Sequence, residues 1–82
     1  MEKLIGQVIH FFPKAGVMVV RLTDAIAVGD TIKIKRGDGE FSQTVDSMQI
    51  EHQNIDSAQA GEEVAIKAGG ATKEGAGVYK VE

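Results

Sequence analysis

The chain has 82 residues, 43% hydrophobic and 26% charged, with no cysteine and a formal net charge of −3. This length allows one domain, residues 1–82, and the missing cysteines exclude disulfides, thiolate catalysis and sulfur-based zinc sites. The charge gives no general attraction to phosphate, so nucleic-acid binding would need a local basic patch. No apolar run is long enough to span a membrane, and we expect a cytoplasmic protein without a membrane partner.

Short runs of alternating apolar and polar residues recur along the chain, which is typical of β-strands rather than helices. Pro13 ends the first run because proline cannot donate to a β-ladder, and a Gly29-Asp30 turn precedes the third. In the third run, Ile32 and Ile34 alternate with lysines. In chain order, the predicted strands cover residues 6–12, 17–22, 31–35, 41–50, 63–67 and 77–81.

The segments between these strands indicate how they connect. Residues 36–40 are typical of a hairpin turn, and the imperfect alternation of residues 41–50 predicts a bulge and a bend. Residues 51–59 are mostly polar, and within them residues 54–58 are expected to form a loop or one helical turn. With no room for crossover helices, we predict an all-β fold: a small closed antiparallel β-barrel of about six strands.

Four short sequences occur in a characteristic order: Lys14-Ala15-Gly16-Val17-Met18-Val19-Val20-Arg21-Leu22, Val28-Gly29-Asp30, Ala60-Gly61-Glu62-Glu63-Val64 and Gly77-Val78-Tyr79-Lys80-Val81. Together they resemble the second domain of translational GTPases such as elongation factor Tu. The resemblance implies a translation-protein barrel that stands alone. The chain lacks the Gly-x-x-x-x-Gly-Lys-Ser/Thr phosphate cradle, so we expect no bound nucleotide and no GTPase activity.

The resemblance also implies where an acceptor-end pocket for aminoacyl-tRNA would lie. In elongation factor Tu this pocket uses a Glu, an Arg and an Asn, and the matching positions here are Gln49, His52 and Glu63. None of the three identities is kept, and a carboxylate in place of an amide should repel phosphate. The aminoacyl-tRNA function is therefore not carried over.

Basic residues on the predicted outer face offer a different route to RNA. Lys33 and Lys35 project from the same side of a strand if Ile32 and Ile34 are buried. The alternative is that these lysines only protect an outer strand face against aggregation. The hypothetical RNA-binding residues are Arg21, Lys33, Lys35, Arg36 and Lys67.

The sequence offers little for catalysis or for a cofactor. No serine lies in a nucleophile motif such as Gly-x-Ser-x-Gly, and His10 and His52 lack a metal-binding spacing such as His-Glu-x-x-His. Of the few aromatic side chains, Phe41 and one of Phe11 and Phe12 should be needed for the core. We therefore expect no enzyme activity, no metal and no cofactor.

Two functions follow from this sequence. The main prediction is a non-catalytic, translation-factor-like module that docks on RNA or a ribonucleoprotein. The alternative is a protein-interaction module that acts in trans with a larger enzyme, because collagenase-like peptidases carry a similar C-terminal barrel. The acidic composition, with a pI near 5.3, favours a protein partner over RNA.

Overall fold

The computed structural model of the protein describes residues 2–37, 39–70 and 72–81. Strands and turns make up this part of the chain, and it contains no helix long and apolar enough to cross a membrane. The strands of the described residues are β1 (Glu2–Phe12), β2 (Val17–Leu22), β3 (Ile26–Ala27), β4 (Thr31–Arg36), β5 (Gly39–Thr44), β6 (Met48–Ile50), β7 (Gln53–Ile55), β8 (Ser57–Ala58), β9 (Glu63–Lys67) and β10 (Gly77–Val81).

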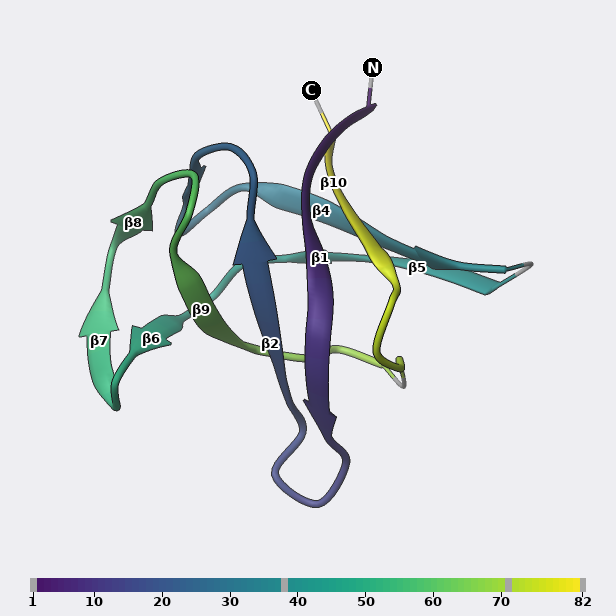
Figure 1. The fold of residues 1–82 in the computed structure, drawn as a ribbon, viewed down its shortest axis with the longest axis horizontal. Helices are drawn as coiled ribbons and strands as arrows, with labels where there is room; N and C mark the ends of the chain where they lie inside the picture. The colour runs from purple at the N-terminus through teal and green to yellow at the C-terminus, as the bar shows by residue number, and fades with distance from the viewer. Residues whose placement is uncertain (1, 38, 71, 82) are drawn as a thin grey trace.

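Eight of these strands form one antiparallel sheet in the order β5-β4-β10-β1-β2-β9-β6-β7, and β3 pairs with β8 in a small second sheet. The first and last strands are neighbours, since Glu2 of β1 lies opposite Val81 of β10 (Figure 1). The β4–β5 hairpin projects to one side of the molecule, and β6, β7 and β8 lie on the opposite side (Figure 1). The structure is therefore a small all-β fold with antiparallel sheets.

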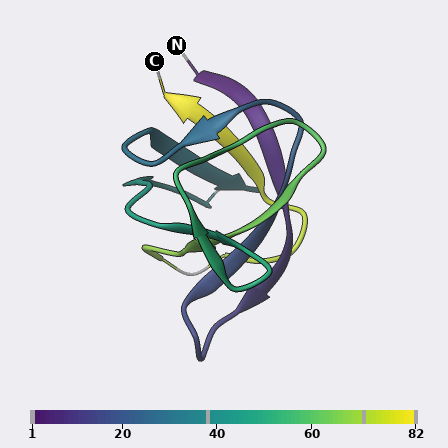
Figure 2. The same cartoon turned by 90° about the vertical axis from the view of Figure 1, so that its left-hand side faces the viewer.

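The core lies on the inner face of the large sheet, where strand alternation places every second side chain. Pairing is irregular in β1 between Leu4 and Gly6 and again between Val8 and His10. Such bulges bend a strand and increase its twist, and the sheet curls round its core (Figure 2). The buried apolar residues are Ile5, Val8, Met18, Val20, Leu22, Ile26, Ile32, Ile34, Val45, Met48, Ala58, Val64, Ile66, Ala76 and Val78.

The predicted closed barrel of about six strands is wrong in its closure and its strand number. The end strands of the large sheet, β5 and β7, are not paired with each other in the described part of the chain. Val45, which follows β5, exchanges hydrogen bonds with the 28–30 turn instead: its amide donates to the Asp30 carbonyl, and its own carbonyl accepts from Gly29. The chain thus leaves the sheet after β5 and re-enters it as β6 beside β9.

Most predicted strands are confirmed. Three match β2, β9 and β10 at both ends, while β1 begins earlier than predicted and β4 ends one residue later. The predicted run 41–50 breaks into β5 and β6, where a bend was expected. The expectation of a loop or helical turn at residues 54–58 is wrong because β7 and β8 lie there, and β3 was not predicted.

The predicted hairpin at residues 36–40 is confirmed by the pairing of Arg36 with Gly39, although Asp38 lies outside the described residues.

The phenylalanines were expected to place Phe41 and one of Phe11 and Phe12 in the core. Phe11 and Phe41 are half-buried and pack against the core, whereas Phe12 is 51% exposed. Two of the three phenylalanines therefore contribute to packing.

Candidate functional site

Lys33 and Lys35 are both half-buried on β4, and Glu2 of β1 pairs with both ammonium groups. Glu2 Oε2 lies 2.6 Å from Lys33 Nζ, and its other carboxylate oxygen pairs with Lys35. Glu40 on β5 places a second carboxylate 4.0 Å from Lys33 Nζ. Two carboxylates therefore offset two ammonium groups, and this part of the surface has little charge with which to attract phosphate.

This cluster connects four strands, β1, β4, β5 and β10, across the outer face of the sheet. Hydrogen bonds from Lys33 and then from Lys35 lower the pKa of the Glu2 carboxyl to about 2. The bond to Glu2 in turn raises the pKa of Lys35. Lys35 Nζ also lies 4.8 Å from the centroid of the Tyr79 ring on β10, which separates β1 from β4. Because these contacts join side chains on neighbouring strands, they support a structural role for Glu2, Lys33 and Lys35.

The other basic residues of the hypothesis do not join this cluster. Arg21 lies opposite Glu63 in the β2–β9 pair, and Lys67 lies opposite Val17 at the other end of that pair. Arg36, at the end of β4, shares one hollow with Lys35 and also lines a separate cavity. The strand pairing thus places Arg21 and Lys67 apart from the three residues of β4, and whether any of the five binds a ligand stays a prediction.

The three positions of the acceptor-end pocket, by contrast, do come together. Gln49, His52 and Glu63 line one open hollow of about 670 Å³ between the β6–β7 hairpin and β9. Glu51 and Glu62 line the same hollow. Its three carboxylates would repel a nucleic-acid phosphate, so the chemistry differs from that of a tRNA pocket.

The β6–β7 hairpin that borders this hollow has an unusual turn. Glu51 and His52 form a two-residue loop between the paired Ile50 and Gln53, and both have positive φ, 51° and 65°. Two-residue hairpins of this kind favour Asn-Gly or Asp-Gly because glycine, and to a lesser degree asparagine and aspartate, adopt positive φ with less strain than other residues. Neither Glu51 nor His52 is a typical choice for such a turn.

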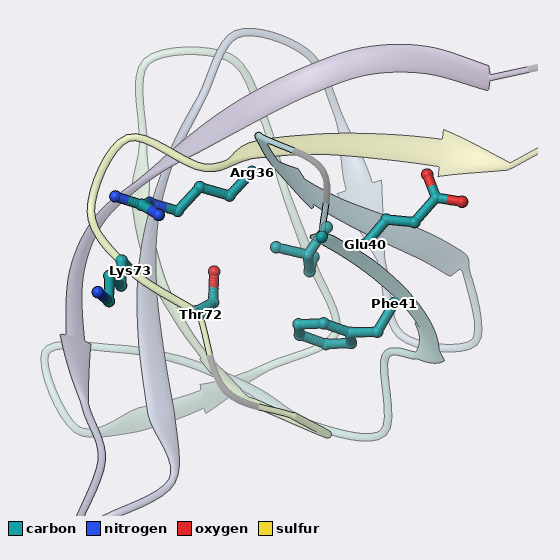
Figure 3. Close-up of a pocket in the computed structure, with 7 residues that line it drawn as sticks. Arg36, Glu40, Phe41, Thr72 and Lys73 are labelled. Carbon is teal, nitrogen blue, oxygen red and sulfur yellow. The ribbon is translucent and has the colours of Figure 1, made fainter.

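A second cavity, of about 330 Å³, lies beneath the β4–β5 hairpin (Figure 3). Buried Ile34 and the half-buried ring of Phe41 give it an apolar side. Arg36 extends across it toward Lys73, while the carboxylate of Glu40 points away from the other labelled side chains (Figure 3). The lining residues are Ile34, Arg36, Gly39, Glu40, Phe41, Thr72 and Lys73.

Thr72 sets this cavity apart from the other hollows of the surface. The residue is 8% exposed and is the buried polar residue among those that the structure describes. Its Oγ1 is buried, has no hydrogen-bond partner in residues 2–37, 39–70 and 72–81, and points into the space between Arg36 and Phe41 (Figure 3). A buried hydroxyl without a partner is costly, so it calls for a physical explanation.

The cavity continues into a neighbouring hollow of about 620 Å³ that shares Arg36, Thr72 and Lys73. Glu74 lines this second hollow, and its carboxylate lies 3.6 Å from His10 Nδ1. Of the two lining carboxylates, Glu40 thus lies near the Lys33 ammonium and Glu74 near the His10 ring. Neither Arg36 nor Lys73 forms an ion pair within the described ranges.

The positions of the histidine and acidic side chains also bear on metal binding. Within residues 2–37, 39–70 and 72–81, no three His, Asp or Glu side chains gather closely enough to hold a metal ion. His10 and His52 lie on different elements, at β1 and at the β6–β7 turn. The expectation that the protein uses no metal or cofactor stays a prediction.

Comparison with known proteins shows where this fold occurs. No family model matches the chain. An uncharacterized protease of Methanocaldococcus jannaschii is 37% identical over 76 residues, which cover 92% of this chain. The chain spans 19% of that relative's length, so the match concerns one part of a larger protein.

Two solved structures are similar to the protein over nearly its whole length. One is the C-terminal domain of a Geobacillus thermoleovorans protein named as a U32 peptidase: the TM-score is 0.91 with 18% identity, over 98% of this chain and 93% of that domain. The selenomethionine variant of that domain gives a TM-score of 0.87 with 18% identity, over 93% and 96% of the two chains. The chain has the fold of a U32 peptidase C-terminal domain.

These comparisons correct the translation-factor prediction. The relatives are named as a protease and a U32 peptidase C-terminal domain, not as an elongation factor domain. The translation and RNA-binding assignments are therefore wrong. The turns that suggested them, at Gly29 and Gly61, have positive φ, so these glycines report on backbone geometry rather than on a shared activity.

No pattern in the sequence predicts the cavity beneath the β4–β5 hairpin. Arg36 was named for its charge, but Thr72 and Lys73 come from a segment that looked like a plain connection before the last strand. These residues meet because β10 lies beside β4 in the sheet. A short, polar, non-repetitive segment that packs on a half-buried phenylalanine carries no pattern by which it can be found.

Proposed function

We propose that this chain is a non-catalytic protein-interaction module that serves a peptidase of the U32 type. The module acts as a separate subunit or as one part of a longer chain. The observation that carries this proposal is the 37% identity to the Methanocaldococcus jannaschii protease across 92% of this chain. The likeness to the C-terminal domain of a protein named as a U32 peptidase supports it at the level of fold.

The physical character of the surface agrees with a protein partner. Ion pairs offset much of the basic charge on β4, and the hollow beside β9 is acidic. Leu4, Phe12, Val28 and Val81 are large apolar side chains that remain exposed among the described residues. Interfaces between proteins combine such apolar contacts with a polar rim, and they depend less steeply on salt than phosphate contacts do.

An association experiment tests the proposal. The Methanocaldococcus jannaschii protease, with the segment that matches this chain deleted, is titrated into the ¹⁵N-labelled protein while amide resonances are recorded. We expect resonances from one contiguous face to shift or broaden most, because binding changes the local environment of the contact residues, whereas slower tumbling of the complex broadens all resonances alike. An unrelated protein of similar size serves as the control and should leave the spectrum unchanged.

Two results would contradict the proposal. One is an unchanged spectrum at the highest concentration that both proteins tolerate. The other is hydrolysis of a fluorescent protein substrate by this chain alone, since the proposal assigns catalysis to the partner.

A further inference from the structure

We propose that the cavity beneath the β4–β5 hairpin binds the carboxyl end of a peptide whose last residue is aliphatic. The cavity is the space lined by Ile34, Arg36, Phe41, Thr72 and Lys73 together with the rim residues Gly39 and Glu40. Its volume of about 330 Å³ is at the small end of the range for ligand pockets. A terminal residue fits this size better than a folded surface does.

The apolar side of the cavity selects an aliphatic group. Ile34 is 2% exposed, and Phe41 packs against the core with part of its ring facing the cavity (Figure 3). A Cβ added at Gly70 would lie 3.4 Å from the Phe41 ring, so the backbone at Gly70 passes close to the ring. The ring is thus held in place, and a methyl-rich side chain could pack against its accessible part.

The charged side of the cavity selects a carboxylate. Arg36 and Lys73 lie at its edge, and no carboxylate of the described residues forms an ion pair with either. Glu40, which also lines the cavity, points away from it and lies 4.0 Å from Lys33 Nζ (Figure 3). A planar guanidinium is well suited to a carboxylate because it can donate two parallel hydrogen bonds.

Thr72 supplies the observation that points to a ligand. Its hydroxyl is buried, points into the cavity and has no partner in the described ranges (Figure 3). A hydroxyl can donate to a carboxylate oxygen and accept from a peptide N–H, and the end of a peptide offers both. An aliphatic residue, a carboxylate and a peptide N–H are adjacent in one chemical group, the C-terminal residue of a peptide.

This assignment rests on the proposed function for the source of its ligand. Hydrolysis of a peptide bond by a partner enzyme creates a new terminal carboxylate, and a module with this cavity would retain that product end. The binding itself needs only this chain. If the peptide does not bind, the proposed association with a peptidase still stands. If that association is not found, the proposed binding of a peptide carboxyl end still stands.

The experiment titrates the ¹⁵N-labelled protein with an acetylated peptide Gly-Ala-Gly-Leu that carries a free carboxyl end. The expected result is saturable binding, with shifts concentrated at the amides of Arg36, Gly39, Thr72 and Lys73. The same peptide with an amidated end should bind at least about tenfold more weakly, because it lacks the charge that the two cations attract. Acetate and inorganic phosphate, titrated alone, test whether an anion suffices.

Variants then test the residues. Thr72→Val keeps the shape of the side chain but removes the hydroxyl, and Arg36→Gln removes the guanidinium. Each variant should bind the peptide with the free carboxyl end about tenfold or more weakly than the native protein does. Arg21→Gln removes a positive charge from an exposed position on β2, outside the cavity, and should leave the affinity unchanged. Circular dichroism of each variant confirms that it is folded.

Equal binding of acid and amide peptides would overturn the proposal, as would equal binding of acetate or phosphate. The proposal would also be overturned if both cavity variants bound the peptide as tightly as the native protein. Resonance shifts centred elsewhere on the sheet, or no saturable binding of the peptide, would overturn it as well.

Discussion

Thr72 carries a polar oxygen into an otherwise apolar interior. Fifteen apolar residues make up the buried core of the described part of the chain, and Thr72 is the polar residue buried with them. Its Oγ1 has no partner there. Leaving such a group unsatisfied costs about 1–3 kcal/mol, whereas an apolar group of the same shape would not incur this cost. The residue therefore lowers stability in the unbound protein.

Thr72→Val should accordingly raise the free energy of unfolding by about 1 kcal/mol, because valine replaces the hydroxyl with a methyl group of similar size. For a domain of this length that corresponds to a rise in Tm of about 4–8 °C, measured by differential scanning calorimetry. Thr72→Ser keeps the hydroxyl and should not raise the Tm. A lower Tm for the valine variant would show that the hydroxyl is satisfied in solution.

Gly6 matters for a different reason, the close approach of two strands. A Cβ at this position would lie 2.8 Å from the Arg21 carbonyl oxygen and 2.8 Å from Val20 Cγ1. The Arg21 oxygen belongs to the backbone and cannot move without disturbing the β1–β2 pairing. The glycine also sits at an irregularity in the β1–β10 register.

We predict that Gly6→Ala destabilises the protein by about 1–3 kcal/mol, the usual cost of overpacking. Urea unfolding followed by circular dichroism measures this change. Gly39→Ala is the matched control, since its nearest neighbour would be an ordinary 3.5 Å away. If the two variants were equally stable, the close approach at Gly6 would not exist in solution.

Among the strands and turns, the β6–β7 hairpin is the element whose sequence fits its geometry least well. Its two turn residues, Glu51 and His52, have φ values of 51° and 65°, which asparagine and glycine adopt more readily. The hairpin is nevertheless formed, with Met48 buried and paired to Ile55. Packing of this strand against the core therefore outweighs the local preference of the turn.

Replacing Glu51-His52 with Asn-Gly should relieve this strain and raise the free energy of unfolding by about 1–2 kcal/mol. Thermal unfolding of the double variant measures the gain. As a control, Glu51→Gln alone removes a charge but keeps an unfavourable residue, so most of the gain should be absent. A double variant no more stable than this control would argue against a strained turn.

The sequence predicts the long strands well because alternation on β2, β4 and β9 reflects a sheet with one buried face. It does not predict β3 or β8, since a two-residue strand is too short to show a period. The break at Val45 also decides the closure of the sheet, and it depends on hydrogen bonds to the distant 28–30 turn. For the candidate site, Arg36 could be named from its charge, whereas Thr72 became notable only once its burial was known.

Across the whole molecule, the cluster around Glu2 links the start of the chain to β4 over the last strand. The folded-state pKa of Glu2 is about 2, below its ordinary value of 4.5. The carboxylate thus stabilises the fold fully above about pH 4.5, and this stabilisation is lost as the pH falls toward 2.

Glu2→Gln should remove this part of the acid sensitivity. The variant should be less stable than the native protein near neutral pH, and the difference should shrink between pH 4.5 and about 2. Urea unfolding over a pH series at low salt provides the measurement. Glu62→Gln is the control. A difference between native protein and Glu2→Gln that stays constant across this pH range would refute the assigned role of Glu2.

The organisation of the molecule as a whole fits a module that is built to be attached. Its first and last strands are paired neighbours, with Glu2 opposite Val81. A relative carries a matching segment as 19% of a longer protein. A fold whose first and last strands lie side by side can be joined to a larger protein with little disturbance of its core.

The central claim is that this module packs against a peptidase, and calorimetry of a chimera tests it most directly. In the chimera, the 82 residues replace the matching segment of the Methanocaldococcus jannaschii protease. We predict that the module then unfolds at a higher temperature than the isolated chain, because contacts with the peptidase body stabilise it. A module that unfolds in the chimera at the same temperature as it does alone would contradict the account.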